Sequence, residues 1–210
     1  KRAWRHMTSA TSQDTAEAAE FKMYGNVFRS GKETGTDDFS PEFCQAIIKL
    51  ADNLKEQEAT VSQDQRIEQI RNNSMFGIDD PDFINTVLYA TLAANLQQGW
   101  NFDIQGVQTL QLSKYTVGEK YSWHIDYDHG EQARKLTFNV VLNDDYEGGD
   151  FQFSWGSPSA PYRKRVIKEW AMRVPGRIVI FPSYYYHRVT PVTKGVRYSL
   201  TGWAYGPAFR

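Results

Sequence analysis

Two histidines and one aspartate are the residues of this sequence whose types and spacing best suit metal chemistry. His124 and Asp126 stand two apart in the run 121–126, and His187 lies in a second run, 185–189. In an extended strand, residues two apart point to the same face, about 7 Å apart for a rise of ~3.3 Å per residue. Their side chains converge on one ion if the strand ends or bends there. Two imidazoles and one carboxylate leave positions open on an octahedral metal, which dioxygen chemistry requires.

Each part of this pattern also has a purely structural interpretation. His124 could hydrogen-bond Asp126 at a strand end, and His187 could be a buried core histidine beside the tyrosines at 184–186. A zinc hydrolase on a β scaffold is a further alternative, because it needs three protein ligands and an activated water. The three residues alone leave these interpretations open.

Arg197 adds an observation that discriminates among them. On the extended run 196–205, Arg197, Ser199 and Thr201 share one face, which is polar although neighbouring runs are apolar. A buried arginine is rare unless it is paired, and its planar fork binds a carboxylate through two hydrogen bonds. The partner is either a protein carboxylate such as Glu147 or a small dicarboxylate whose other end chelates the metal. A zinc hydrolase leaves Arg197 unexplained.

Two amphipathic helices are predicted in the first half of the chain. Ser40 and Pro41 have the residue types of an N-cap and a first helical position, and apolar residues then recur every three or four positions to about residue 55. Asp79-Asp80-Pro81 begins a second such helix, which ends near Gly99. Both helices precede the candidate site in the sequence.

Beyond Gly99 the chain consists of short β-branched or aromatic runs separated by turn residues. The predicted strands are residues 107–115, 121–126, 136–142, 150–153, 177–181, 185–189 and 196–205. Several short strands without intervening helices indicate a sandwich, a barrel or a jelly roll. Polar loops are predicted at residues 30–38, 56–65 and 154–170.

Composition and charge limit the class of protein. The chain has 210 residues, of which 40% are hydrophobic, so it can form one generous domain. Its 24 Lys and Arg against 25 Asp and Glu give a net charge of −1, which does not favour nucleic acid as a partner. Cys44 is the only cysteine, and no apolar run approaches the ~18 residues of a membrane span. We therefore expect a cytoplasmic, intracellular protein with no membrane partner.

The chain is predicted to divide into an arm and one domain. Residues 1–20 are polar and aperiodic and form the expected N-terminal arm. Residues 21–210 form the expected single domain, with helical support at about 40–100 and a β core at about 101–207. The sequence does not determine the oligomeric state.

A series of motifs in the second half of the chain resembles a known family. The motifs are Tyr115-x-x-Gly118, Trp123-His124-x-Asp126, Leu142-Asn143, Glu147-Gly148-Gly149-Asp150-Phe151, Phe181-Pro182-Ser183, His187-x-Val189 and Gly195-x-Arg197. Together they resemble the iron(II)/2-oxoglutarate-dependent dioxygenases, in particular the prolyl 4-hydroxylase-like branch with its bacterial and viral members. The separation of ten between His187 and Arg197 is the family's spacing. The resemblance covers about residues 40–207, most strongly from 110 onward.

This resemblance implies a fold and a set of site residues. The fold is mainly β, a double-stranded β-helix or jelly-roll core packed against two or three N-terminal helices. The residues implied to bind iron are His124, Asp126 and His187, and those implied to bind 2-oxoglutarate are Arg197, Tyr115, Ser199 and Asn139. Animal collagen-type prolyl hydroxylases have a lysine where this chain has Arg197, so the match is to their bacterial relatives.

The resemblance also implies a reaction. The enzyme would use Fe(II), 2-oxoglutarate and O2, with ascorbate as an accessory, to hydroxylate a C–H bond and release succinate and CO2. Since the acidic position is Asp126 and not Ala or Gly, the pattern favours hydroxylation over halogenation. Peptidyl proline is the expected substrate, with another protein residue or a free small molecule as alternatives, and the expected source is bacterial, viral or phage. The competing function is a non-catalytic jelly-roll binding module.

Overall fold

The computed structural model describes residues 27–51 except 33 and 36, and residues 57–58, 71–127, 132–155 and 165–209. The expected N-terminal arm at 1–20 lies outside this part of the chain. The elements follow in the order β1 (Phe28–Arg29), α2 (Pro41–Leu50), β2 (Gln57–Glu58), β3 (Ser74–Ile78), α4 (Pro81–Gln97), β4 (Gly106–Val107), β5 (Leu110–Tyr115), β6 (Tyr121–His124), β7 (Gln132–Val141), β8 (Glu147–Gly148), β9 (Phe151–Trp155), β10 (Arg165–Lys168), a 3-10 turn η1 (Trp170–Arg173), β11 (Ile178–Pro182), β12 (Tyr186–Val189), β13 (Val192–Lys194) and β14 (Arg197–Pro207).

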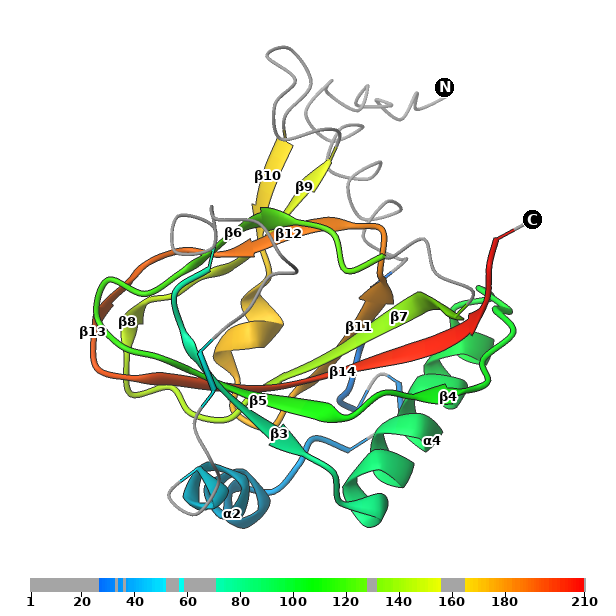
Figure 1. Cartoon of the computed structure of the whole chain (residues 1–210), viewed down its shortest axis with the longest axis horizontal. Coiled ribbons are helices and arrows are strands. Elements are labelled where there is room, and N and C mark those ends of the chain that lie inside the picture. The colour runs from blue at the N-terminus through cyan, green and yellow to red at the C-terminus, as the bar shows by residue number, and fades with distance from the viewer. Residues whose placement is uncertain are drawn as a thin grey trace, which may run out of the picture.

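Two antiparallel sheets form the body of the structure. The larger sheet has the strand order β1-β11-β7-β14-β5-β3-β2, with β4 paired to β14, and the smaller sheet has the order β10-β9-β12-β6. The short pair β13 and β8 lies at one end, and the two sheets face each other across the interior (Figure 1). The fold is therefore mainly β, and this pair of facing sheets is the jelly-roll arrangement that the sequence predicts.

The strands at the centre of the larger sheet are buried on both faces. In β7, Phe138 and Val140 pack into an apolar cluster with residues of α2 and α4, whereas Val141 packs into a second cluster between the sheets. In β11, Ile180 and Phe181 divide between the same two clusters. The two-residue period of a strand thus directs alternate side chains towards the helices and towards the interior.

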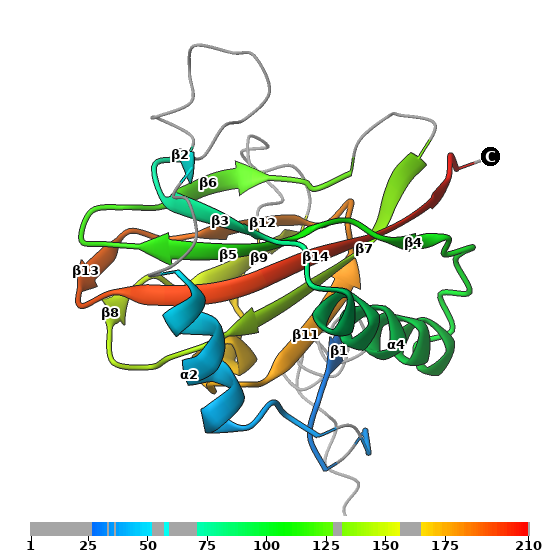
Figure 2. The ribbon, with the colours of Figure 1, turned by 60° about the horizontal axis from the view of Figure 1, so that its bottom comes forward.

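Both α-helices lie on the outer face of the larger sheet, away from the smaller sheet (Figure 2). The Ser40 side chain caps α2 by accepting a hydrogen bond from the Phe43 backbone N–H, and Pro41 occupies the first turn. The Asp80 carboxylate caps α4 in the same way. The helices anchor the larger sheet from behind and leave its inner face to the site.

Some sequence-based boundaries were wrong. The first helix ends at Leu50 and not near residue 55, because the Ala51 N–H turns back to the Ile48 and Lys49 carbonyls. Strand β3 lies in a segment that no predicted strand covers, and β10 with the first residue of η1 lies near the end of the predicted polar loop 154–170. These short strands exist because β5 and β9 offer them a partner, not because their own residues favour a strand strongly.

Neither α-helix in the described part of the chain combines the length and the apolar character that spanning a lipid bilayer demands.

Gly176 marks a close approach between two segments that flank the larger sheet. Its φ of +82° is left-handed, and a Cβ at this position would lie 2.1 Å from the Phe39 carbonyl oxygen. The Phe39 N–H donates to the Gly176 carbonyl, so the two backbones cannot separate without losing that bond. We expect Gly176→Ala to lower the free energy of unfolding by about 2 to 4 kcal/mol, from the left-handed φ and the backbone overlap together. Chemical denaturation measures this loss.

Gly35 provides the matched control for this prediction. It also has a left-handed φ, +66°, but none of the described atoms lies within 4 Å of the position that a Cβ would take. Gly35→Ala should therefore cost only the conformational part, about 1 to 2 kcal/mol. Equal losses in the two variants would contradict the role assigned to the Phe39 contact.

Candidate active site

The smaller sheet brings His124 and His187 together as a direct cross-strand pair. His124 is the last residue of β6, and it lies opposite His187 of β12 in the antiparallel register. Because β6 ends at His124, the chain turns and brings the Asp126 carboxylate back to both rings. The His124 Nε2 lies 3.6 Å from one Asp126 oxygen, and the His187 Nε2 lies 3.3 Å from the other. One donor atom from each residue lies within 4.8 Å of the others.

Backbone carbonyls determine how both imidazole rings point. The His124 Nδ1 lies 2.8 Å from the Ser122 carbonyl oxygen, and the His187 Nδ1 lies 2.9 Å from the Tyr185 carbonyl oxygen. A carbonyl only accepts hydrogen bonds, so Nδ1 carries the hydrogen in each ring. The two Nε2 atoms therefore face the Asp126 carboxylate, and in a neutral ring Nε2 presents a lone pair.

The Asp126 carboxylate is held from the larger sheet. The Thr137 hydroxyl on β7 donates to Asp126 Oδ2 over 2.8 Å, and the Ser183 hydroxyl lies 3.1 Å from that of Thr137. The Ser183 carbonyl accepts the backbone N–H groups of Asp126 and Tyr127. These contacts tie the turn after β6 to the turn between β11 and β12, so the carboxylate cannot swing away from the histidines.

The surroundings of His124 and Asp126 favour the deprotonated forms of these two groups. Burial, together with the neighbouring His187 imidazole, lowers the pKa of His124 to about 3, although the Asp126 carboxylate acts in the opposite direction. Burial raises the pKa of the Asp126 carboxyl, but the two imidazoles and the Thr137 hydroxyl outweigh burial and hold this pKa below its usual range. At neutral pH His124 is a neutral ring and Asp126 is an anion, which are the forms that bind metal.

Arg197 is the largest of the fully buried side chains in the described residues, with 1% exposure. It begins β14, where the Asn143 side chain bonds the Val196 carbonyl on one side of it and the Tyr198 N–H on the other. Its Nη1 donates to the Ser199 hydroxyl over 2.8 Å, but its Nε and Nη2 have no hydrogen-bond partner. No described carboxylate lies within 4.0 Å of this guanidinium.

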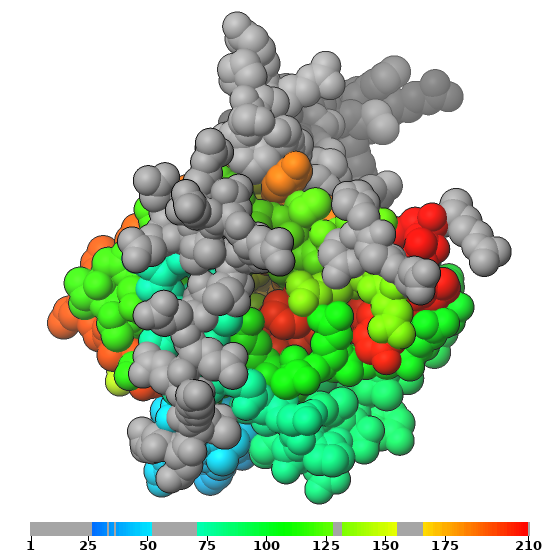
Figure 3. Space-filling view, in the orientation of Figure 1, coloured from blue at the N-terminus to red at the C-terminus, as the bar shows by residue number. Residues whose placement is uncertain are grey.

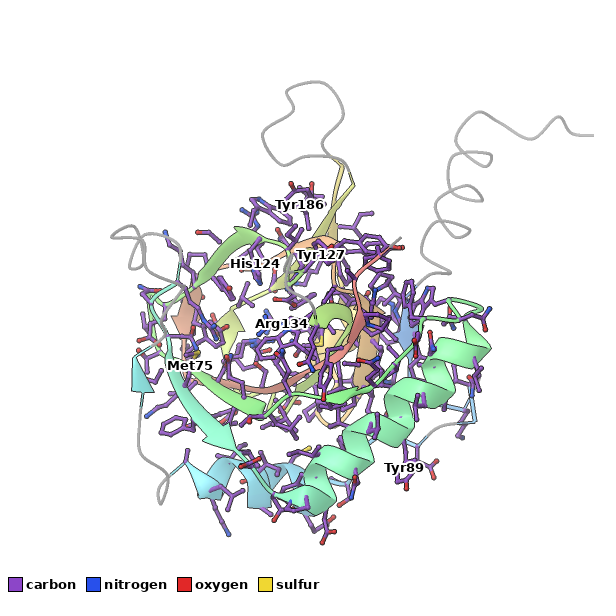
Figure 4. All side chains as sticks on the ribbon, turned by 45° about the vertical axis from the view of Figure 1, so that its right-hand side comes forward. Met75, Tyr89, His124, Tyr127, Arg134 and Tyr186 are labelled. Atoms are coloured by element: carbon purple, nitrogen blue, oxygen red, sulfur yellow. The ribbon has the colours of Figure 1, made fainter. Side chains whose placement is uncertain are left out.

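The triad and Arg197 line one pocket between the two sheets. Figure 3 shows this face of the molecule hollowed near its centre, with atoms of β14 visible in the hollow. The other lining residues are Arg71, Gln111, Ser113, Tyr115, Tyr121, Asn139, Phe151, Val189, Ser199, Thr201 and Trp203. Figure 4 shows His124 on the smaller sheet in the upper half of the view and Tyr89 on α4 in the lower half. The pocket thus has a metal-ligating wall on one sheet and a polar wall on the other.

The remaining predicted residues lie in this pocket as well. Tyr115 pairs with Arg197 across β5 and β14, and the Arg197 guanidinium lies 5.4 Å from the centre of its ring. Asn139 on β7 donates to the Thr201 hydroxyl over 3.1 Å, while its Oδ1 is buried without a partner. The alternative that Glu147 is the partner of Arg197 is wrong. The Glu147 carboxylate lies at the surface and pairs with Lys194 at 2.9 Å.

Sequence reasoning missed three residues that shape the site. Thr137 holds Asp126, and its signal was present, because it shares a strand face with Asn139 two positions later. Tyr121 stacks on the His124 ring with centroids 3.5 Å apart, and burial raises the pKa of its phenol to about 12. The Arg71 guanidinium lies over the Tyr121 ring, 4.5 Å from the ring centre, and no local pattern in the sequence assigned Arg71 to the site.

The residues present fit a divalent metal and a carboxylate guest. Lone pairs and a carboxylate facing each other at 3.3 to 3.6 Å repel unless a cation lies between them. Two imidazoles and one carboxylate are a donor set typical of non-haem iron(II). The Nε and Nη2 of Arg197 are a buried cationic fork with no anion in the described part of the chain, which a carboxylate would satisfy. Both observations come from the geometry of this chain alone.

Known proteins show the same core. Residues 110–205 match the sequence model of the 2OG-Fe(II) oxygenase superfamily, where 2OG is 2-oxoglutarate. A PKHD-type hydroxylase of Synechococcus sp. (strain CC9605) is 35% identical over 103 residues, which are 48% of this chain and 43% of that protein. These matches confirm the resemblance that the motifs predict. The chain spans less than half the length of this relative.

Solved structures share the fold. A prolyl-4-hydroxylase from Pseudomonas putida has a TM-score of 0.65 and 20% identity, over 90% of this chain and 97% of that chain. A prolyl hydroxylase in complex with a hypoxia inducible factor peptide fragment, from Trichoplax adhaerens, also has a TM-score of 0.65, with 17% identity, over 94% of each chain. At these identities the likeness concerns the fold alone.

Proposed function

We propose that this chain, whose residues 110–205 match the 2OG-Fe(II) oxygenase superfamily, is an Fe(II)- and 2-oxoglutarate-dependent dioxygenase that hydroxylates a C–H bond. The observation that carries the proposal is the presence in one pocket of a convergent His-Asp-His set and a buried arginine without an anion. A metal site alone would suit many reactions. A metal site and a carboxylate site together suit a co-substrate that bridges them.

We assign the metal to His124, Asp126 and His187, and the far carboxylate of 2-oxoglutarate to Arg197. Ser199 already accepts a hydrogen bond from Arg197, so it orients the guanidinium fork. The Tyr115 hydroxyl and the Asn139 amide are assigned as further contacts to the co-substrate, because both side chains line the same pocket. When bound, Fe(II) with 2-oxoglutarate and O2 supplies the oxidising chemistry, and succinate and CO2 are the co-products.

The protein residues position the reactants and limit access to them. The Ser122 and Tyr185 carbonyls hold a proton on the Nδ1 of each ligand histidine, which keeps both Nε2 atoms available. Thr137 keeps the Asp126 carboxylate aimed at the same point. The apolar side chains of Phe151 and Val189 line the pocket beside His187 and reduce the water around it.

Peptidyl proline is the substrate that we propose, with a free small molecule as the alternative. The support comes from relatives, because the similar folds include proteins named as prolyl hydroxylases, one of them in complex with a peptide. We propose ascorbate as an accessory reductant. A non-catalytic jelly-roll binding module would retain the fold but would not couple the co-substrate to oxidation.

The decisive experiment incubates the Fe(II)-loaded protein with 2-oxoglutarate, air and a pool of proline-containing peptides. We expect peptides that gain one oxygen atom, in a one-to-one ratio with succinate released. A parallel incubation with a pool of free metabolites separates the small-molecule alternative. Folded, metal-bound protein that releases no succinate with either pool would favour the binding module, and a gain of oxygen on residues other than proline would reject only the prolyl assignment.

A further inference from the structure

The described residues contain two buried arginines without a carboxylate partner, Arg71 and Arg197. The proposed function assigns a ligand only to Arg197. Arg71 is 5% exposed and lines the same pocket as Arg197 and the triad. The partly buried Arg29, Arg173 and Arg177 have the carboxylates of Glu169, Asp150 and Asp38 as partners. Burying a cation without an anion costs free energy. A ligand that brings an anion to Arg71 would offset that cost.

The protein satisfies Arg71 only in part. Its Nε donates to the Asn73 side-chain oxygen over 2.8 Å, and its Nη2 lies 3.4 Å from the Ser113 hydroxyl, which is a long contact. A guanidinium has five N–H donors, so these two neutral partners leave most of its capacity unused among the described residues. Its flat face rests on the Tyr121 ring, with 4.5 Å between the guanidinium carbon and the ring centre. The guanidinium is thus held in place while its donors stay available to the pocket.

Counting charges shows which ligand Arg71 suits. This step rests on the proposed function. The Asp126 carboxylate and one carboxylate of 2-oxoglutarate balance a divalent metal, and the other carboxylate balances Arg197. The described residues that line the pocket include no second carboxylate. Among the described lining residues, Arg71 is then the one charge that metal, co-substrate and described carboxylates leave unbalanced.

The location of Arg71 places this charge beside the metal ligands. Tyr121 stacks on Arg71 and also on His124, whose ring centre is 3.5 Å away. Arg71 further contacts Ser113, which pairs with Ser199 across β5 and β14. We propose that Arg71 binds a carboxylate of the substrate that the enzyme hydroxylates. The preferred substrate is then an anionic prolyl compound. That carboxylate belongs either to the C-terminus of a peptide or to an acidic side chain next to the proline.

Binding measurements without turnover test this proposal. The full chain is loaded with Fe(II) and 2-oxoglutarate under argon, and three probes are titrated by calorimetry. They are acetyl-Ala-Pro-Ala-amide, acetyl-Ala-Pro with a free C-terminal carboxylate, and acetyl-Asp-Pro-Ala-amide. We expect at least one of the two carboxylate probes to bind about tenfold or more tightly than the neutral probe, as for hydrogen bonds to charged groups. The tighter carboxylate probe identifies the source of the anion.

Variants assign the preference to Arg71. R71Q should bind the neutral and carboxylate probes within about twofold of each other, and R71K should retain part of the preference because it keeps the charge but not the planar fork. R188Q is the matched control, because Arg188 also lies over an aromatic ring, that of Trp123 at 4.6 Å, but does not line the pocket. R188Q should keep the full preference. R71K also serves if R71Q fails to fold, since loss of all preference in folded R71K would contradict the proposal.

The outcomes separate this inference from the proposed function. If 2-oxoglutarate does not bind the Fe(II)-loaded protein, the proposed function fails. If it binds but the wild type does not prefer either carboxylate probe, only the role of Arg71 is overturned. A large loss of 2-oxoglutarate affinity in R71Q would also overturn it, because Arg71 would then act on the co-substrate and not on the substrate.

Discussion

Replacement of His187 by alanine is expected to lower the affinity for Fe(II) by more than about 100-fold and to abolish succinate release. Changes in residues that only orient metal ligands already cost 10- to 100-fold in affinity, and His187 lies in direct contact with Asp126 at 3.3 Å. Its loss leaves one imidazole and one carboxylate, which do not hold a divalent ion firmly. Anaerobic titration with Fe(II) measures the affinity, and the weak visible absorption expected with 2-oxoglutarate should disappear.

The control for this variant is the adjacent residue on the same strand. Arg188 points to the opposite face of β12, where it contacts Gln152 and Trp123. R188Q should therefore keep both the Fe(II) affinity and the visible band, which excludes a general disturbance of β12. Retention of the wild-type Fe(II) affinity by folded H187A would contradict the assignment of the metal site.

Replacement of Arg197 by methionine is expected to separate ligand binding from protein stability. Methionine keeps an unbranched side chain of comparable reach in the buried site but has no charge. The affinity for 2-oxoglutarate should fall by roughly 10- to 100-fold, as expected for the loss of hydrogen bonds to a charged group, while the Fe(II) affinity should change by less than about threefold. The Nε and Nη2 donors without partners carry this expectation, because they are available only to a ligand.

The ligand-free R197M protein should be at least as stable as the wild type. A buried guanidinium that has the Ser199 hydroxyl as a partner but no anion is unfavourable in the absence of ligand. Saturating 2-oxoglutarate should raise the melting temperature of the Fe(II)-loaded wild type, since a ligand at 100 times its Kd adds about 2.7 kcal/mol. It should raise that of R197M far less. A marked loss of stability in ligand-free R197M, with 2-oxoglutarate affinity intact, would show that Arg197 is a structural residue.

The sequence predicted best those elements that are determined by residue type and by the spacing of apolar residues along the chain. Ser40 and Asp80 cap the two helices as their residue types predict, because capping depends only on neighbours in the chain. The strands that carry the site were also predicted, since their apolar residues alternate or run together over several positions. Among the strands that were missed, β3 and β10 are short and contain glycine or charged residues, so their pairing with β5 and β9 decides their conformation.

Local sequence patterns did not predict the contacts between segments that are distant in the chain. Asn143 fixes the backbone on both sides of Arg197 from more than 50 residues away in the chain, and Glu147 proved to bond Lys194 instead of Arg197. Arg71 lies against Tyr121 through a similar long-range contact. A side chain's partner in such cases depends on strand register and sheet curvature, which no short stretch of sequence specifies.

The sequence by itself determined which groups are available for chemistry: two imidazoles and one carboxylate with the right spacing, and an arginine on a polar strand face ten residues after the second histidine. Only the tertiary structure decided that these groups share one pocket, that the rings turn their Nε2 atoms towards Asp126, and that the Arg197 fork has no anion among the described residues. The physical reason is that residue type sets what a group can bind, whereas the pairing of β6 with β12 and of β14 with β5 sets which groups meet and which charges are left for a ligand.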